Sequence, residues 1–226
     1  NLSLNFVQSG KRTYQDFYNE VTSIANYLLS SGIRKGDKIA ILSANMPNWG
    51  ITQFAIARIG AIAVPVLPGF SSIEIQNILE HSESKIIFVS KLLYKLVADI
   101  KTSYLEQKIL MNTFARIPEE YPVEAIDKLE NNIGLNNLTP LPAIQVEEED
   151  TASIIYTSGT TGFSKGVELT HRNLVWNARQ CATIQPVSTQ DRFLSILPLA
   201  HTYENTLGLL LPIMFGAQIY YLDRVP

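Results

Sequence analysis

The sequence predicts an α/β protein built on a doubly wound, largely parallel sheet with helices on both faces. Short apolar runs, typical of buried strands, alternate along the chain with segments whose apolar residues recur at helical spacing. Capping residues and Gly or Pro signals separate the two kinds of segment. Strands that alternate with helices pair in parallel, because each crossover returns the chain to the same edge of the sheet.

The clearest helix is predicted over residues 13–32. Thr13 and Asp16 have the spacing of a capping box, and Gly32 supplies a C-terminal stop. A buried strand is expected over residues 38–42, and Pro47 fits the first turn of a second helix. The apolar face of the first helix consists of Phe17, Val21, Ile24, Ala25, Leu28 and Leu29.

The alternation continues as far as residue 111. The next helix is expected to start near Ser72, because Ser71 and Glu74 again have capping spacing. A further helix is expected near residues 92–100. The predicted strands of this part span residues 61–66, 85–89 and 108–111.

The alternation is interrupted between residues 113 and 150. The stretch 113–142 is rich in Pro, Asn and Glu and holds one weak helical segment at 123–129. Any internal boundary of the chain is therefore expected within 113–150, where the acidic run 147–150 is expected to be a solvated loop. Beyond it the pattern predicts a strand at 151–157, a helix at 173–183, and strands at 192–197 and 218–222.

Composition and charge disfavour several classes of protein. Of the 226 residues, 46% are hydrophobic and 17% are charged, as in an ordinary soluble globular protein. Eighteen basic and 21 acidic residues give a formal charge of −3, so no broad basic field is available to hold a nucleic acid. The single cysteine, Cys181, forms no internal disulfide and is expected to pack within a helix.

Targeting signals are also missing from the sequence. No signal peptide is visible, and the most apolar stretch, residues 54–70, is too broken by charged, Gly and Pro residues to cross a membrane. These features favour a cytoplasmic location, with peripheral contact at a membrane left open.

Chemistry is concentrated in residues 157–166, which read TSGTTGFSKG and directly follow an apolar strand. The N–H groups of a glycine-rich turn, hydroxyl donors and a lysine charge are the groups that bind phosphate oxygens. A polar surface hairpin is the alternative, because Gly, Ser and Thr are also ordinary turn residues. The position after a buried strand and the positive charge of Lys165 favour phosphate binding.

Two common nucleotide-binding patterns are not matched. The Walker pattern needs Gly, four residues, then Gly-Lys and Ser or Thr, whereas here Lys165 precedes Gly166. The Rossmann Gly-x-Gly-x-x-Gly fingerprint is missing too, since Gly159 and Gly162 have no glycine two positions ahead of them. A P-loop kinase and an NAD-dependent dehydrogenase are therefore disfavoured.

The run from Tyr156 through the glycine-rich loop to Val167 closely resembles the signature of the adenylate-forming (AMP-binding) superfamily, which includes acyl-CoA ligases, luciferases and peptide-synthetase adenylation domains. The family usually has Pro where this chain has Ser164, so one φ restraint is lost. The resemblance covers nearly the whole chain. Its other segments read GDKIAIL at 36–42, NMPNW at 45–49, GAIAVPV at 60–66, LTHRNL at 169–174 and LPLAH at 197–201.

The resemblance implies an enzyme in which a carboxylate attacks the α-phosphate of ATP to give an acyl-adenylate, and a thiol then displaces AMP. It implies ATP, Mg²⁺ and coenzyme A. His201 would lie near the acyl-adenylate, whereas His171 is expected to be a structural residue near a helix start and His81 a surface residue. The β- and γ-phosphates would be cradled by Thr157, Ser158, Gly159, Thr160, Thr161, Gly162 and Lys165.

The segments 166–171 and 199–204 look most like those of long-chain fatty-acid–CoA ligases, which implies a fatty acid as substrate. Family segments for the adenine, the ribose and a lid lysine are not found, so the chain is expected to be the N-terminal portion of an AMP-binding domain and inactive alone. An acyl-carrier-protein ligase and an amino- or aryl-acid adenylating enzyme remain alternatives. The non-enzymatic alternative is a nucleic-acid-binding module with a Gly-x-x-Gly loop at residues 159–162.

Overall fold

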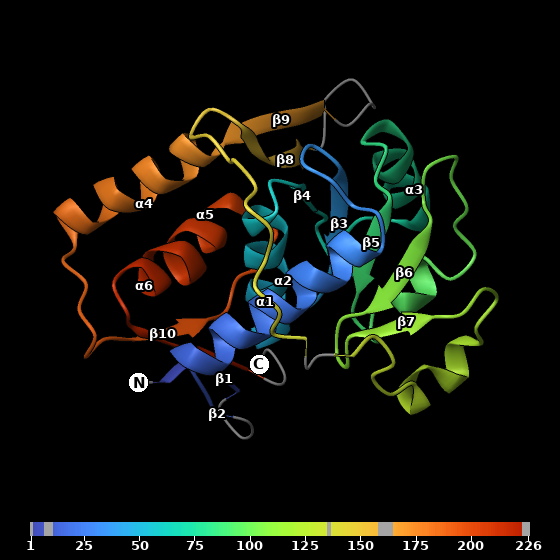
Figure 1. The fold of residues 1–226 in the computed structure, drawn as a ribbon, viewed down its shortest axis with the longest axis horizontal. Helices are drawn as coiled ribbons and strands as arrows, with labels where there is room; N and C mark the ends of the chain where they lie inside the picture. The colour runs from blue at the N-terminus through green and yellow to red at the C-terminus, as the bar shows by residue number, and fades with distance from the viewer. Residues whose placement is uncertain (1, 7–10, 135–136, 158–164, 223–226) are drawn as a thin grey trace.

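The computed structural model describes residues 2–6, 11–134, 137–157 and 165–222 (Figure 1). Within these residues the strands form two sheets. Helices α1 (Tyr14–Ser30) and α2 (Pro47–Arg58) pack against each other and contribute side chains to a core shared with strands of both sheets.

The larger sheet has seven strands among the described residues, in the order β7-β6-β5-β3-β4-β8-β9. The five inner strands are parallel to one another, as the sequence predicts. The two edge strands, β7 (Ala115–Ile117) and β9 (Lys165–Thr170), are antiparallel to their neighbours and were not predicted as strands. The parallel strands are β3 (Lys38–Leu42), β4 (Ile62–Pro65), β5 (Ile86–Val89), β6 (Gln107–Leu110) and β8 (Thr151–Thr157).

The smaller sheet joins the two ends of the described chain. Strand β11 (Gln218–Tyr221) lies between β10 (Arg192–Ser195) and β1 (Leu2–Phe6), parallel to both, and β2 (Lys11–Thr13) pairs antiparallel with β1. The strands predicted at 192–197 and 218–222 are therefore confirmed, but they belong to a second sheet, with β1 and β2 as unpredicted partners.

The helices begin where the capping signals place them. Thr13 with Asp16 and Ser71 with Glu74 both form complete capping boxes, at the starts of α1 and α3 (Ser72–His81). Hydrogen bonds from Thr13 and Ser71 lower the pKa of the Asp16 and Glu74 carboxyl groups. Pro47 occupies the start of α2, as predicted.

The helix predicted over residues 92–100 is wrong. The segment instead forms turns around a short 3₁₀ helix, η1 (Tyr94–Leu96). Its buried side chains are Tyr94, Val97 and Ile100, which recur every third residue. That spacing suits 3₁₀ turns, in which side chains three positions apart lie above one another.

The segment predicted to hold an internal boundary, 113–150, contributes β7 to the larger sheet and a second 3₁₀ helix, η2 (Val123–Lys128). The acidic run at its end is largely exposed, as expected, but it also forms ion pairs. Glu148 and Glu149 contact the Arg172 guanidinium, and Asp150 lies 2.6 Å from Lys35 Nζ. Whether 113–150 contains a domain boundary stays a prediction.

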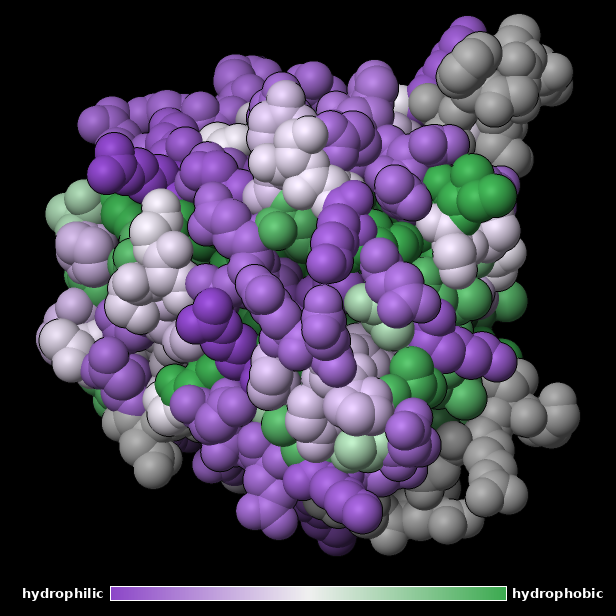
Figure 2. Space-filling view, turned by 90° about the vertical axis from the view of Figure 1, so that its right-hand side faces the viewer, coloured by the Kyte–Doolittle hydropathy of each residue, from purple (hydrophilic) through white to green (hydrophobic). Residues whose placement is uncertain are grey.

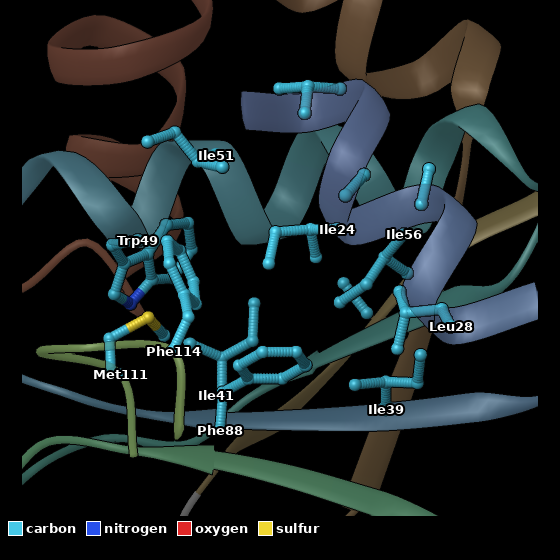
Figure 3. Close-up of a cluster of buried hydrophobic side chains, with 14 of the residues drawn as sticks. Ile24, Leu28, Ile39, Ile41, Trp49, Ile51, Ile56, Phe88, Met111 and Phe114 are labelled. Atoms are coloured by element: carbon cyan, nitrogen blue, oxygen red, sulfur yellow. The ribbon is translucent and has the colours of Figure 1, made fainter. Parts of the chain in front are cut away.

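Strand β3 divides its side chains between two hydrophobic clusters. Ile39 and Ile41 pack with α1, α2 and Phe88 in the first cluster (Figure 3), whereas Ala40 and Leu42 pack with α3 and η1 in the second. These four side chains of β3 are 0% exposed. The larger sheet is thus covered on both faces, which confirms the predicted doubly wound α/β architecture.

The molecular surface near the β7 edge of the larger sheet is mainly hydrophilic, with hydrophobic patches separated by polar residues (Figure 2). No helix formed by the described residues is both long enough and apolar enough to span a membrane.

Candidate functional site

The TSGTTGFSKG motif connects two neighbouring strands at one edge of the larger sheet. Strand β8 is held to β4 by parallel pairing and by a 3.0 Å hydrogen bond that Ser153 Oγ donates to the Ala63 carbonyl. Its antiparallel pairing with β9 runs up to Thr157, which lies opposite Lys165. The two ends of the motif are therefore held in register and exposed to solvent.

Only Thr157 and Lys165 of the predicted phosphate-binding residues belong to the described part of the chain. Ser158, Gly159, Thr160, Thr161 and Gly162 lie outside it. A strand, and not a helix, follows the motif, in keeping with its failure to match the Walker and Rossmann patterns. The phosphate contacts of all seven residues stay a prediction.

Close packing surrounds Tyr156, which precedes the motif on β8 and lies opposite Gly166 of β9. The Tyr156 hydroxyl lies 2.7 Å from His81 Nδ1, and the two rings meet edge to face. Burial raises the pKa of the Tyr156 hydroxyl. A Cβ atom at Gly166 would lie 2.8 Å from Ile154 Cγ2 and 3.3 Å from Tyr156 Cζ, so Gly166 allows the close approach of β9 to β8. His81 is exposed, as predicted, but its contact with Tyr156 was not foreseen.

Helix α4 (His171–Ile184) begins at the end of β9, two residues earlier than predicted. Thr170 and Asn173 form its capping box, and the His171 N–H donates to the Asp150 carbonyl. The His171 side chain is half-buried, and its Nε2 has no hydrogen-bond partner among the described residues. Burial lowers the pKa of His171, although the nearby Asp150 charge opposes this shift. Cys181 lies within the same helix, as expected, and is partly exposed.

The predicted active-site histidine, His201, lies on a turn after β10. Its N–H donates to the Pro198 carbonyl at 2.8 Å, and its carbonyl accepts from the Asn205 N–H at 2.9 Å. The His201 ring is exposed, and its Nδ1 accepts from the Tyr203 N–H at the start of α5 (Thr202–Glu204). A π-helix, η3 (Asn205–Leu210), continues directly into α6 (Leu211–Met214).

The π-helix is closely packed at Gly208. Gly208 packs directly against the Glu204 carboxylate, and a Cβ atom at position 208 would collide with it. Glu204 is buried and accepts a 2.7 Å hydrogen bond from Ser195 Oγ. π-helical turns are rare, and those that occur are often found at functional sites. In this chain the π-helix comes immediately after the segment that carries His201.

A cavity of about 620 Å³ brings the parts of the site together. One wall comes from β8, β9 and α4, and the opposite wall comes from the residues on either side of His201 and from η3. His201 does not line the cavity itself, but both of its neighbours do. The lining residues are Pro65, Ser153, Ile155, Leu169, Arg172, Asn173, Leu174, Trp176, Asn177, Leu199, Ala200, Thr202, Asn205 and Thr206.

The described lining of the cavity offers few charged groups for binding a ligand or a metal ion. Arg172, the one charged side chain in the described lining, is already engaged by Glu148 and Glu149. Within the described ranges, no cluster of three or more His, Cys, Asp or Glu side chains could hold a metal ion. The arrangement is suited to an apolar ligand with polar groups at its rim, next to a loop of phosphate-binding composition.

A family model for the AMP-binding enzymes matches residues 3–226, almost the entire chain. The chain belongs to this family. This result confirms the membership inferred from the TSGTTGFSKG motif and its neighbouring segments.

Two curated relatives of this chain differ from each other in both the acid and the acceptor that their names give. The crotonobetaine/carnitine–CoA ligase of Citrobacter koseri is 34% identical over 196 residues, which cover 84% of this chain and 36% of that protein. The chloroplastic long-chain-fatty-acid–[acyl-carrier-protein] ligase of Arabidopsis thaliana is 32% identical over 210 residues, covering 86% of this chain and 29% of that protein. The chain therefore spans about a third of the length of these relatives.

Solved structures support the same fold. The apo structure of MatB from Rhodopseudomonas palustris superimposes with a TM-score of 0.79 at 19% identity, covering all of this chain and 43% of that one. At this identity the likeness concerns the fold alone, and it agrees with the α/β architecture described above.

Gly166→Ala should destabilise the β8–β9 pair, because the added methyl group would press against Ile154 and Tyr156. We expect the free energy of unfolding of the chain to fall by about 1–3 kcal/mol, as for overpacked positions. Denaturant titration measures this change. The matched control is Gly69→Ala, since a Cβ atom at Gly69 meets nothing within 4 Å. Equal effects at the two positions would contradict the packing argument.

The lowered pKa of His171 predicts a pH-dependent part of the stability. The unfolded chain takes up a proton on His171 near the ordinary value of 6.5, whereas the folded chain does so only at lower pH. Stability from this group is therefore complete above pH 6.5 and is lost as the pH falls from there through the folded pKa. His171→Gln should reduce the slope of unfolding free energy against pH in this window. Parallel curves for the two proteins would refute it.

Proposed function

We propose that this sequence belongs to an ATP-dependent acid–thiol ligase that activates a fatty acid as an acyl-adenylate and transfers it to coenzyme A. The observation that carries the proposal is the position of the TSGTTGFSKG motif, whose flanking strands border the same cavity as the segment around His201. Because the chain spans about a third of its relatives' length, the activity is proposed for the whole protein that contains it.

The first step joins the acid to AMP. A carboxylate oxygen attacks the α-phosphorus of ATP, the bond from that phosphorus to the bridging oxygen breaks, and pyrophosphate leaves. In the second step a thiolate sulfur attacks the acyl carbon and AMP leaves with the electron pair of the acyl–oxygen bond. Such chemistry depends on positioning and on neutralising charge, for which hydroxyl groups, backbone N–H groups and a lysine are suitable.

Residues 157–162 and Lys165 are proposed to hold the β- and γ-phosphates, and His201 is proposed to lie near the acyl-adenylate. Lys165, at the start of β9, is exposed and forms no ion pair with another described residue. None of these residues is proposed as a covalent nucleophile. Mg²⁺ is proposed as well, from the resemblance to the family, and it would neutralise phosphate charge together with these residues.

A fatty acid is favoured by the apolar part of the cavity lining, which includes Leu169, Leu174, Trp176 and Leu199. Each methylene group buried there would contribute about 0.8 kcal/mol to binding. The resemblance of segments 166–171 and 199–204 to long-chain ligases supports a long acyl chain. We also propose a cytoplasmic protein, with peripheral membrane contact left open.

Other substrates remain as second candidates. The similarity to a carrier-protein ligase of Arabidopsis thaliana supports an acyl carrier protein as the alternative acceptor. An amino or aryl acid is the alternative acid, and a substrate series separates it from fatty acids. The net charge of −3 counts against a nucleic-acid-binding module, and titration with labelled RNA at low salt would reveal one.

Lys165→Ala should slow adenylation in the full-length protein, because one positive charge on the phosphates is lost. We expect the rate of acid-dependent exchange of pyrophosphate into ATP to fall by about 10- to 100-fold, as for removal of one electrostatic donor. Lys101→Ala is the matched control, since that side chain is 84% exposed and far along the sequence from the motif. Unchanged exchange in the Lys165 variant would remove this residue from the phosphate site.

The full-length protein should prefer long acyl chains. We expect kcat/KM, the ratio that expresses discrimination between substrates, to rise with each added pair of carbons until the cavity is full. The reason is that each methylene group buried in the cavity adds to the binding free energy. A series of saturated acids from acetate to palmitate measures it. A maximum at acetate or at an aromatic acid would overturn the fatty-acid assignment and leave the adenylation chemistry standing.

A further inference from the structure

The side chain of Asn45 bridges two distant parts of the chain. Asn45 follows β3 at the carboxyl end of the larger sheet, while its partners lie in the segment between β10 and His201. Its Nδ2 donates to Ser195 Oγ at 2.9 Å and to the Leu197 carbonyl at 2.6 Å. Its Oδ1 accepts from the Leu199 N–H at 2.9 Å.

These three hydrogen bonds use both donors and the acceptor of one amide group. They hold the segment at residues 195, 197 and 199: through the side chain of Ser195, and through backbone groups of Leu197 and Leu199 that cannot shift without breaking a bond. Ser195 links Asn45 to Glu204, because the Ser195 hydroxyl accepts from Asn45 and donates to the buried Glu204 carboxylate at 2.7 Å. An aspartate at position 45 would keep the acceptor and lose both donors.

Burial alone does not hold this segment. The Ile196 and Leu197 side chains are each 47% exposed, and His201 is exposed as well. Leu199 is the first side chain after Ser195 that is fully buried. The path of the backbone toward His201 is therefore defined mainly by hydrogen bonds, with Asn45 at its centre.

A second amide pair secures the far side of the same turn. Asn205 and Gln53 exchange hydrogen bonds of 2.7 and 3.2 Å, and Asn205 Nδ2 also approaches the Leu199 carbonyl at 3.3 Å. Leu199 is thus held at its N–H by Asn45, in the loop after β3, and at its carbonyl by Asn205 of η3. Both contacts act on a residue that lines the cavity.

We propose that Asn45 is a positioning residue: it fixes residues 197–201, and through them His201, at the edge of the cavity that receives the acid. This role rests on the proposed function. It predicts an effect on the acid that is separate from the effect on ATP, because the strands that flank the TSGTTGFSKG motif are held by the pairing of β8 with β9 and β4, and the side-chain hydrogen-bond partners of Asn45 among the described residues all lie at residues 195–199.

The first test concerns the backbone and needs no activity. Amide hydrogen exchange in the chain should become about 10-fold faster at Leu199 in Asn45→Ala than in the unaltered protein, since loss of a bond favours local opening. Asn26→Ala is the matched control, because the Asn26 amide likewise donates two hydrogen bonds to a distant segment, here to the Asn137 and Thr139 carbonyls. Unchanged exchange at Leu199 in Asn45→Ala, or the same increase in both variants, would overturn the proposal.

Asn45→Asp keeps the test decisive if the alanine variant does not fold. It retains an acceptor for the Leu199 N–H and removes the two donors, so amide exchange should increase at Ile196 and Leu197 more than at Leu199. A general loss of protection across the larger sheet in both variants would show a merely structural role and contradict the assignment.

The second test measures pyrophosphate exchange in the full-length protein. Asn45→Ala should lower kcat/KM for the acid by about 10- to 100-fold, as expected for a misplaced active-site segment, and leave KM for ATP within about twofold. Equal losses for acid and ATP would overturn the positioning role. If the unaltered protein itself shows no exchange with any acid, the proposed function fails, while hydrogen exchange at Leu199 still decides whether Asn45 holds the segment.

Discussion

The burial of β3 on both faces is the constraint on which the other parts of the structure depend. Its alternate side chains enter two separate cores, so helices must cover both sides of the larger sheet. A slip of one residue would exchange the side chains that enter the two cores, and their different volumes would no longer fit the packing. With β3 fixed, the residues that follow its carboxyl end, Asn45 and the start of α2, have a fixed position from which to contact other segments.

Polar contacts dominate where the strands end. Asn45 reaches the segment before His201, and Asn48, at the start of α2, donates to the Met111 and Asn112 carbonyls after β6. One short stretch, NMPNW, thus connects three loops at the carboxyl edge of the sheets. Hydrogen bonds suit this task because each fixes a particular backbone group in direction and distance, at the exposed Leu197 as well as at the buried Met111 and Leu199.

The sequence predicts features that depend on local spacing. The capping boxes at Thr13 and Ser71, the parallel inner strands and the family signature are all of this kind. Partner choice over long distances leaves no local pattern, so the second sheet, which pairs β1 with β11, was not foreseen. The same holds for the site: the motif was found at once, whereas the contacts of Asn45 with residues 150 and more positions away needed the structure.

The contact between Gly208 and Glu204 has a consequence for evolution within the family. A side chain at position 208 would displace the Glu204 carboxylate, and with it the hydroxyl of Ser195 that Asn45 contacts. A larger residue at 208 would need the space that the end of the Glu204 side chain now fills, so the residues at these two positions are expected to vary together among relatives.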